Sequence, residues 1–345
     1  MVFKWVEILK EKRLKILYAL KIRKEWLYLR LRKGIRRMET LFITHPVCRL
    51  HMMHKWHPES PKRLDAINDR LLASGISTYL THLDAPKATV VDLSRVHEIA
   101  YIDFIRENIP EDGYFNVDTE ETCLNPHTYN AALHAAGAGI LALDQMMSKQ
   151  AKNAFCSVRP PGHHAEPNRS TGFCFFNNAA VTAAYAIEKY GFKRIAIIDF
   201  DVHHGNGTEK IFQNHPYVKM YSFFQHPLFP YSGTENVAKN MLNTPLPAYS
   251  GMAAVEKVVT EHWLPDMHDY KPELVLICAG FDAHREDEMG QMDLVEKDFV
   301  WLTKELMKIA DSYSEGRIIS FLEGGYELSS LGRSAVEHIK TLADL

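Results

Sequence analysis

The chain has 345 residues, 46% of them hydrophobic and 24% charged, a composition that argues against disorder and suffices for one large globular domain. The net charge of −3 hides an asymmetry, because residues 1–37 carry 13 Lys and Arg against three Glu and the remainder is acidic by 13 charges. No apolar run approaches the roughly 20 residues of a membrane span. The five cysteines include no C-x-x-C pair, which argues against a disulfide framework or a thiolate zinc site and predicts a cytoplasmic protein.

The first 38 residues mix Lys and Arg with Trp, Leu, Ile and Tyr and contain one Gly and no Pro. This composition predicts a basic helical extension ahead of a single domain of residues 39–345. Contact with a membrane surface or with nucleic acid is one interpretation of the extension. An organelle presequence is a weaker one, because Ser is absent and Glu is present. A dispensable extension remains the simplest interpretation.

From residue 40 onward, apolar strand-like runs alternate with stretches of helical period. The predicted strands are residues 40–45, 153–158, 194–199, 218–223, 273–280 and 317–325. The predicted helices are residues 129–149, 177–191, 253–267 and 295–313. The strands are continuously apolar rather than alternating, which predicts an α/β fold with a mostly parallel sheet sandwiched by helices.

Four of the predicted strands are followed by polar motifs: "RPPGHHAE", "DFDVHHGNG", "FDAHRED" and "EGGYE". Ligands of parallel α/β sheets bind at the carboxyl ends of the strands. We therefore expect distant parts of the chain to bring His, Asp and Tyr side chains to one edge of the sheet.

Asp201 and His203 lie two residues apart at a strand end, where extended geometry would point both side chains the same way. Asp282, at another strand end, is a candidate third ligand. Two carboxylates and one imidazole suit Zn²⁺, and three protein ligands leave a position open for water or substrate. Taken alone, a D-x-H pattern is weak, and capping or hydrogen bonding would explain it equally well.

His163 and His164 follow two prolines and a glycine, a loop suited to presenting side chains. One of the two histidines can act as a general base, with Asp199 and Asn206 as candidates to orient them. Tyr326 follows two glycines, where we expect an open, mobile backbone and a hydroxyl that donates to a developing oxyanion.

The motifs "RPPGHHAE", "GFCFFN", "DFDVHHGNGT", "AGFDAH" and "EGGY", in this order, closely resemble the histone deacetylase family, in particular its class II and bacterial histone-deacetylase-like amidohydrolase branch. The resemblance begins near "HPESPKRL" (57–64) and runs almost to the C-terminus. It implies an arginase–deacetylase fold with a mainly parallel sheet of about eight strands. It also implies zinc-dependent hydrolysis of acetyl-lysine in proteins or peptides.

The resemblance assigns a role to each motif residue. Asp201, His203 and Asp282 would bind zinc, and Tyr326 would bind the acetyl oxygen. His164 would be the general base, oriented by Asn206, and His163 its electrostatic or acid partner, oriented by Asp199. A structural potassium ion would be held by Asp199 and Ser222.

The resemblance also implies a tunnel for the substrate. Phe173 and Phe229 would be its aromatic walls, with Gly172 beside the first of them, because a lysine stem gains by lying against apolar rings. Met289 would line the mouth and Asp118 would be a rim carboxylate. Arg63 would line the acetate-exit channel.

Three alternatives remain open. A two-manganese ureohydrolase is disfavoured because Gly205 and His284 stand where its metal-binding pattern needs acids. An acetylpolyamine deacetylase is a closer rival, although Met289 stands where the resemblance implies that polyamine specificity takes a glutamate. A catalytically inactive acyl-lysine binder is disfavoured because Tyr326 and every expected ligand are present.

Overall fold

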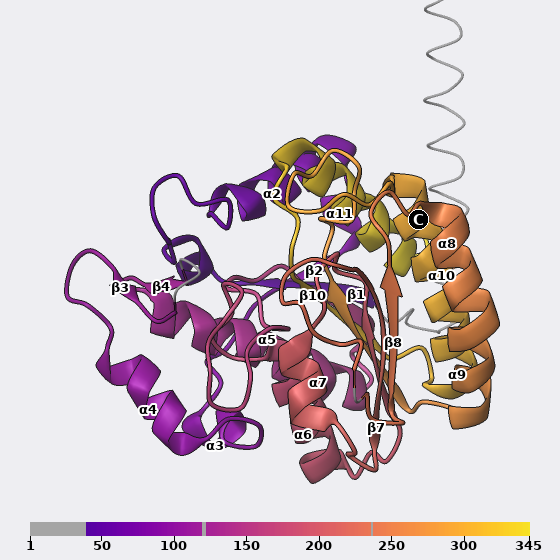
Figure 1. Cartoon of the computed structure of the whole chain (residues 1–345), viewed down its shortest axis with the longest axis horizontal. Coiled ribbons are helices and arrows are strands. Elements are labelled where there is room, and N and C mark those ends of the chain that lie inside the picture. Colours follow the sequence, from indigo (N-terminus) through magenta and orange to yellow (C-terminus); the bar gives the residue numbers. More distant parts are fainter. Residues whose placement is uncertain (1–38, 119–121, 236) are drawn as a thin grey trace, which may run out of the picture. The chain divides into compact units, whose positions relative to one another are not determined.

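In the computed structural model, which describes residues 39–118, 122–235 and 237–345, the chain folds around an eight-stranded sheet. Its order is β2-β1-β5-β10-β9-β6-β7-β8, and every neighbouring pair is parallel (Figure 1). The strands are β1 (Glu39–Thr44), β2 (Thr81–Asp84), β5 (Ala151–Cys156), β6 (Ile195–Asp199), β7 (Val218–Gln225), β8 (Met241–Leu246), β9 (Leu274–Ala279) and β10 (Ile318–Leu322). A separate antiparallel pair consists of β3 (Phe115–Asn116) and β4 (Cys123–Leu124).

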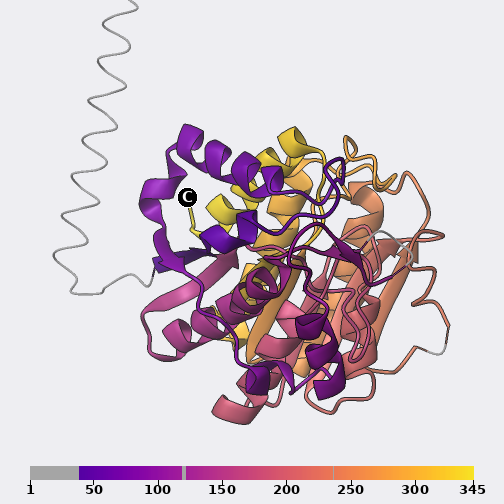
Figure 2. The same ribbon diagram turned by 90° about the vertical axis from the view of Figure 1, so that its left-hand side faces the viewer.

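Helices cover both faces of the sheet (Figures 1 and 2). α5 and α6 contact each other and pack against β5, β9 and β10, whereas α10 and α11, with α2 beside them, form the other layer. The helices are α2 (Lys62–Ser74), α3 (Val90–Leu93), α4 (Ile99–Glu107), α5 (Thr128–Met147), α6 (Asn178–Tyr190), α7 (Asn206–Phe212), α8 (Met252–Val258), α9 (Leu264–Tyr270), α10 (Glu296–Tyr313) and α11 (Leu328–Leu342). The short turns are η1 (Pro46–Arg49), η2 (Ile76–Tyr79) and the π-turn η3 (Val259–Trp263), which joins α8 to α9.

The predicted α/β architecture is confirmed, and its physical reason is visible in the central strands. Every residue of β6, β9 and β10 is buried, as expected for apolar strands covered by helices on both sides. The six predicted strands correspond to β1, β5, β6, β7, β9 and β10. The two strands of this sheet that the pattern missed, β2 and β8, are its edges, and the pattern also missed the short pair β3 and β4.

The strand order places the functional motifs together. β5, β10, β9 and β6 are consecutive neighbours in the centre of the sheet, and each of them precedes one of the four polar motifs. Because all four strands are parallel, their carboxyl ends meet at one edge. The expected convergence of distant chain segments is therefore confirmed.

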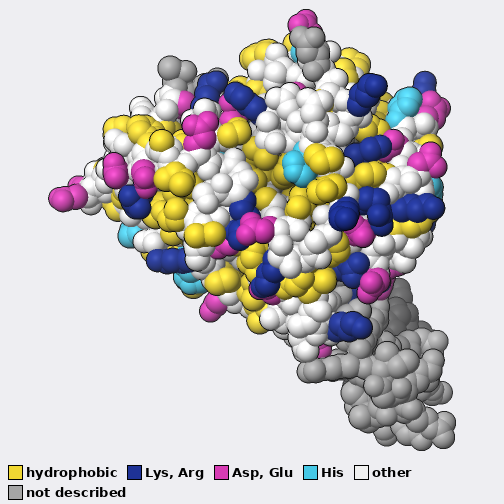
Figure 3. Space-filling model, turned by 90° about the horizontal axis from the view of Figure 1, so that it is seen from below, with side chains coloured by type: hydrophobic (Ala, Val, Ile, Leu, Met, Phe, Trp, Pro, Cys, Tyr) yellow, Lys and Arg dark blue, Asp and Glu magenta, His cyan; other side chains and the backbone are white. Residues whose placement is uncertain are grey.

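On the face of the molecule shown in Figure 3, positive and negative side chains are mixed rather than segregated. On the face shown in Figure 3, acidic and basic side chains are interspersed with hydrophobic ones. The acidic excess of the body therefore does not form one continuous field on this face. Among the residues that the structure describes, no helix is both long enough and apolar enough to cross a membrane. The predicted basic helix of residues 1–38, with its expected membrane or nucleic-acid contacts, lies outside the described residues.

Candidate metal centre and active site

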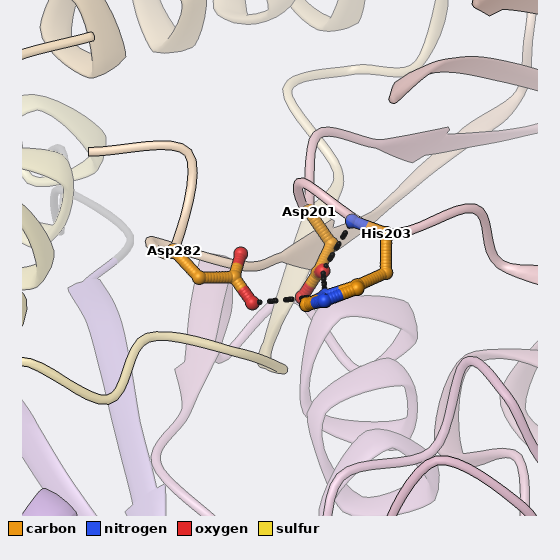
Figure 4. A group of neighbouring side chains, drawn as sticks. All are labelled: Asp201, His203 and Asp282. Carbon is orange, nitrogen blue, oxygen red and sulfur yellow. Dashed lines mark hydrogen bonds and ion pairs between the residues drawn. The ribbon is translucent and has the colours of Figure 1, made fainter. Parts of the chain in front are cut away.

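Asp201, His203 and Asp282 converge at the carboxyl edge of the sheet (Figure 4). One potential ligand atom from each residue lies within 4.8 Å of the others, and all three residues are buried. His203 Nδ1 lies 3.0 Å from Asp201 Oδ1 and 3.3 Å from Asp282 Oδ2. The structure thus brings together the three residues that the sequence predicted as ligands.

The expected reason for this convergence is wrong, however. The chain does not continue as an extended strand from Asp201 to His203 but bends after β6. The His203 backbone N–H donates to Asp201 Oδ1 at 2.9 Å, and the imidazole of the same residue turns back to that oxygen. The Asp201 carboxylate therefore stabilises the bend that places the His203 imidazole beside it.

The cluster has the electrostatic properties of a cation site. Burial and the nearby charge of Asp201 raise the pKa of Asp282 to about 6, which shows how unfavourable two close buried carboxylates are. Within the described part of the chain, Asp282 Oδ2 makes no hydrogen bond of good geometry, and its nearest potential donor is His203 Nδ1 at 3.3 Å. An oxygen and imidazole donor set of this kind fits a divalent metal such as zinc, which would offset the buried negative charge.

His163 is held beside two carboxylates. Its Nδ1 lies 3.0 Å from Asp199 Oδ2, and its Nε2 lies 3.7 Å from Asp201 Oδ2. Burial opposes the charged form of the imidazole, but the Asp199 and Asp201 carboxylates prevail and raise the pKa of His163 to about 10. This ring is therefore a protonated, positively charged group at neutral pH.

His164 has the opposite character. Burial and the adjacent positive charge of His163 lower the pKa of His164 well below its ordinary value, so the ring is neutral at neutral pH. Its Nδ1 donates to Asn206 Oδ1 at 2.8 Å, which leaves Nε2 as the atom that can accept a proton. The Asn206 amide in turn donates to Glu166 Oε1 at 3.0 Å, which fixes the orientation of the amide.

Tyr326 is positioned through its backbone. Its N–H donates to Asp287 Oδ2 at 2.6 Å, while the preceding Gly324 N–H donates to Asp201 Oδ2 at 2.8 Å. The expectation of a mobile backbone at "EGGY" is not supported by this geometry, because the loop is tied to the candidate metal centre. Burial raises the pKa of the Tyr326 hydroxyl well above its ordinary value, so the hydroxyl keeps its proton and can donate.

The two predicted tunnel walls flank the site. The Phe173 ring lies 6.1 Å from that of Tyr326, and the Phe229 ring lies 5.1 Å from that of His164 and 6.2 Å from that of His203. Gly172 has a positive φ of 55°, and a Cβ at this position would lie 2.3 Å from the His164 ring. A glycine here therefore allows the wall to approach the candidate base closely.

Ser222 occupies the position expected for a cation ligand next to Asp199. The two residues are directly paired between β6 and β7, and both are fully buried. Ser222 Oγ has no hydrogen-bond partner within the described residues. A buried hydroxyl beside a buried carboxylate is compatible with a monovalent cation, the role that the resemblance implies for this pair.

The remaining predicted residues lie around this centre. The Arg63 guanidinium sits 4.8 Å from the Tyr326 ring centroid and donates to the Gly325 carbonyl at 2.6 Å. Met289 N–H donates to Asp287 Oδ1 at 3.0 Å, so Met289 is tied to the carboxylate that holds Tyr326. Asp118 Oδ1 accepts from Thr122 N–H at 2.9 Å.

Sequence reasoning missed three buried carboxylates that organise the site. Asp287 accepts from the Tyr326, Glu327 and Met289 backbones, and Glu166 orients Asn206. Glu323 accepts from Gly162 and His163 N–H at 2.7 and 3.1 Å, and burial raises its pKa to about 7. The sequence feature that could have identified these three carboxylates is their position, because each lies within one of the four polar motifs.

The fold and the site define a class: an α/β protein with a candidate metal centre and two oppositely tuned histidines at the carboxyl edge of a parallel sheet. The family model described as "Histone deacetylase domain" matches residues 57–342. The chain belongs to the histone deacetylase family, as its motifs predicted.

Relatives and a solved structure agree with this assignment. The chain is 33% identical to a probable deacetylase of Archaeoglobus fulgidus over 84% of this chain and 82% of that protein. It is 34% identical to the histone deacetylase-like amidohydrolase of Pseudomonas aeruginosa (78% and 72%) and to the human polyamine deacetylase HDAC10 (82% and 44%). The crystal structure of the HDA15 HD domain superposes with a TM-score of 0.82 at 30% identity, covering 89% of this chain and 88% of that chain.

Proposed function

We propose that this protein is a zinc-dependent lysine deacetylase that hydrolyses acetyl-lysine amides in proteins or peptides to acetate and free lysine. One observation carries the proposal: a candidate metal cluster and a neutral, oriented histidine lie between two aromatic walls. Asp201, His203 and Asp282 would hold the zinc ion. When bound, zinc would supply a Lewis acid that polarises the acetyl carbonyl and acidifies a water molecule.

The protein groups divide the proton transfers between them. His164, kept neutral by burial, accepts a proton from the attacking water through Nε2. The Tyr326 hydroxyl donates to the carbonyl oxygen as negative charge develops on it. His163, held positive by Asp199, stabilises that charge. The protonated His164 imidazole then gives its proton to the leaving amine, so that water and amide become acetate and amine.

The surroundings suit a lysine side chain and a fixed catalytic geometry. The Phe173 and Phe229 rings would hold the four methylenes of the lysine between apolar faces, and Gly172 would let the Phe173 wall lie close to His164. Asp118, at the rim, would accept from the substrate backbone, and Arg63 would line the acetate exit. A potassium ion between Asp199 and Ser222 would screen the buried charge beneath His163.

An acetylpolyamine is the second candidate substrate, because a relative bears the name polyamine deacetylase. Met289 argues against it in this chain, since a thioether at the mouth supplies no negative charge for a distal ammonium group. The acidic body would favour any cationic substrate at long range. We therefore place acetyl-lysine polypeptides first.

A direct comparison of substrates tests the proposal. Hydrolysis of an acetyl-lysine peptide, N-acetylputrescine and a trifluoroacetyl-lysine peptide would be measured with the same zinc-loaded preparation. We expect kcat/KM to be highest among the natural amides for the acetyl-lysine peptide. Met289→Glu should shift the ratio toward N-acetylputrescine, and Met289→Leu serves as the neutral control. Exclusive cleavage of N-acetylputrescine by the wild type would replace the proposal with the polyamine alternative, and binding without cleavage would favour an acyl-lysine binder.

A further inference from the structure

A row of aromatic rings leads from the candidate active site to the protein surface. The Phe173 wall meets His57 edge to face at 4.5 Å, and His57 lies 6.4 Å from Trp56. Beyond it, the His54 ring stacks on Trp56 at 5.7 Å with an interplanar angle of 15° and lies 4.9 Å from Tyr114. We call the outer three rings (His54, Trp56 and Tyr114) the aromatic platform.

The platform is open to solvent although it is joined to the Phe173 wall through a buried ring, that of His57. Trp56 is 68% exposed and Tyr114 is 42% exposed, whereas His57 between the platform and Phe173 is buried. Exposed large rings are unfavourable in water, and where they join a binding site they commonly mark a recognition surface. Figure 1 shows the two contributing segments, the indigo chain after β1 and the β3–β4 pair, on the same flank of the molecule.

The segment that carries Trp56 is anchored at both ends. Arg159, which follows β5, donates to the carbonyls of Cys48 and His51 at 2.9 and 3.0 Å and forms a buried ion pair with Glu59. Residues 52–56 lie between these anchors, with Met53 buried and Met52, Lys55 and Trp56 exposed. The backbone on both sides of His54 and Trp56 is therefore held by the same buried arginine that precedes the histidine loop.

The spacing matches a polypeptide flank and does not match a small amide. An extended peptide advances about 3.3 Å per residue, so the Trp56 ring lies within about three residues of a lysine held against Phe173. N-acetylputrescine has no chain that continues past the tunnel mouth in this way. The platform would therefore contribute only to the binding of a polypeptide substrate.

Charge and ring geometry favour one kind of flanking side chain. Two exposed carboxylates, Glu111 and Asp112, lie just before Tyr114 in the chain, and one exposed cation, Lys55, adjoins Trp56 in the chain. Indole and phenol faces attract a planar guanidinium by cation–π interaction and stacking. We propose that the aromatic platform binds an arginine side chain one to three residues from the acetylated lysine, an inference that rests on the proposed function and names its substrate class.

The test compares two acetyl-lysine peptides that differ in one flanking residue, arginine or glycine, together with acetyl-lysine methylamide. We expect wild-type kcat/KM to be about tenfold higher for the arginine peptide. Trp56→Ala should remove most of this preference through KM, while hydrolysis of the methylamide changes less than twofold. Tyr79→Ala is the matched control, because Tyr79 is 53% exposed and precedes the amino end of β2, away from the catalytic edge.

Each outcome is decisive. Equal rates on the two peptides in the wild type, or an equal loss on peptide and methylamide in Trp56→Ala, would overturn the platform. A flanking tryptophan or glutamate that performs as well as arginine would overturn the cation–π interpretation. If the wild type hydrolyses none of the substrates, the proposed function fails, and the Kd values of the same peptides still test the platform: it requires about tenfold weaker binding of the arginine peptide by Trp56→Ala.

Discussion

The protonation states of the candidate catalytic residues depend on their immediate surroundings and not only on their residue types. Two adjacent histidines reach opposite protonation states because one faces Asp199 and Asp201 while the other faces an amide. Tyr326 keeps its proton because it is buried. The sequence could identify these residues by motif, but the division of charge between the histidines depends on distances across the fold.

Replacing Tyr326 by phenylalanine removes one hydroxyl and leaves the backbone contacts to Asp287 intact. We expect kcat to fall by about tenfold to a thousandfold, the usual range for losing an oxyanion donor, with little change in KM. Steady-state kinetics on an acetyl-lysine peptide would measure the effect, and the metal content of the variant should equal that of the wild type. Wild-type turnover by this variant would contradict the role assigned to the hydroxyl.

At the scale of elements, the loops after the strands are tied to one another by carboxylates. Asp287, in the loop after β9, accepts hydrogen bonds from the loop after β10 and from Met289 in its own loop. Glu323, at the end of β10, does the same for the histidine loop after β5. Each loop therefore takes its conformation partly from the next strand in the sheet, which no local sequence pattern reveals.

Asp287→Ala removes the acceptor that positions the Tyr326 backbone. We expect kcat to fall by about tenfold to a hundredfold, since small displacements of a catalytic group have effects of this size, with metal binding retained. Asp287→Asn keeps one acceptor oxygen and should recover part of the loss. Asp293→Ala, which removes an exposed ion-pair partner of Arg285, is the control. Equal kcat in Asp287→Ala and the control would show that Asp287 does not position Tyr326.

Secondary-structure elements could be predicted from the sequence where complete burial makes the residue pattern uniformly apolar. The central strands were found because they are apolar throughout, whereas β2 alternates in burial and the edge strand β8 contains Pro245. α2 was not predicted, because the charged residue Arg63 lies on its buried face and interrupts the apolar pattern. α11 contains Gly332, a residue type that disfavours helix in isolation. In the fold this glycine allows α11 to pack closely on α2, because an added Cβ would lie 2.8 Å from the Ala66 carbonyl oxygen.

On the scale of the whole molecule, a buried ion pair joins the segment before α2 to the loop after β5. Glu59 pairs with Arg159 and lies 3.3 Å from Arg63 Nη1, so one carboxylate faces two buried guanidinium groups. Burial opposes ionisation of Glu59, but Arg159 holds its pKa well below the usual range. The pair therefore stabilises the fold above about pH 4.5, and this contribution is lost as the pH falls toward the folded-state pKa.

Glu59→Gln leaves both guanidinium groups without their counter-charge. We expect the free energy of unfolding, measured by urea denaturation at pH 7, to fall by about 3–5 kcal/mol, the usual cost of breaking a buried pair. The control is Glu337→Gln, which breaks an exposed pair with Lys340 and should change stability by less than about 1 kcal/mol. A loss for Glu59→Gln no larger than that of the control would show that the pair contributes nothing to folding.

The central claim is that hydrolysis depends on a metal ion held by Asp201, His203 and Asp282. The most direct measurement is to strip the protein with a chelator, titrate zinc back, and record bound metal and acetyl-lysine hydrolysis on the same samples, beside Asp201→Ala. We predict that activity disappears on stripping and returns in proportion to one zinc per chain, and that Asp201→Ala binds none at this site. Undiminished hydrolysis by the stripped protein, or full metal occupancy in Asp201→Ala, would contradict the account.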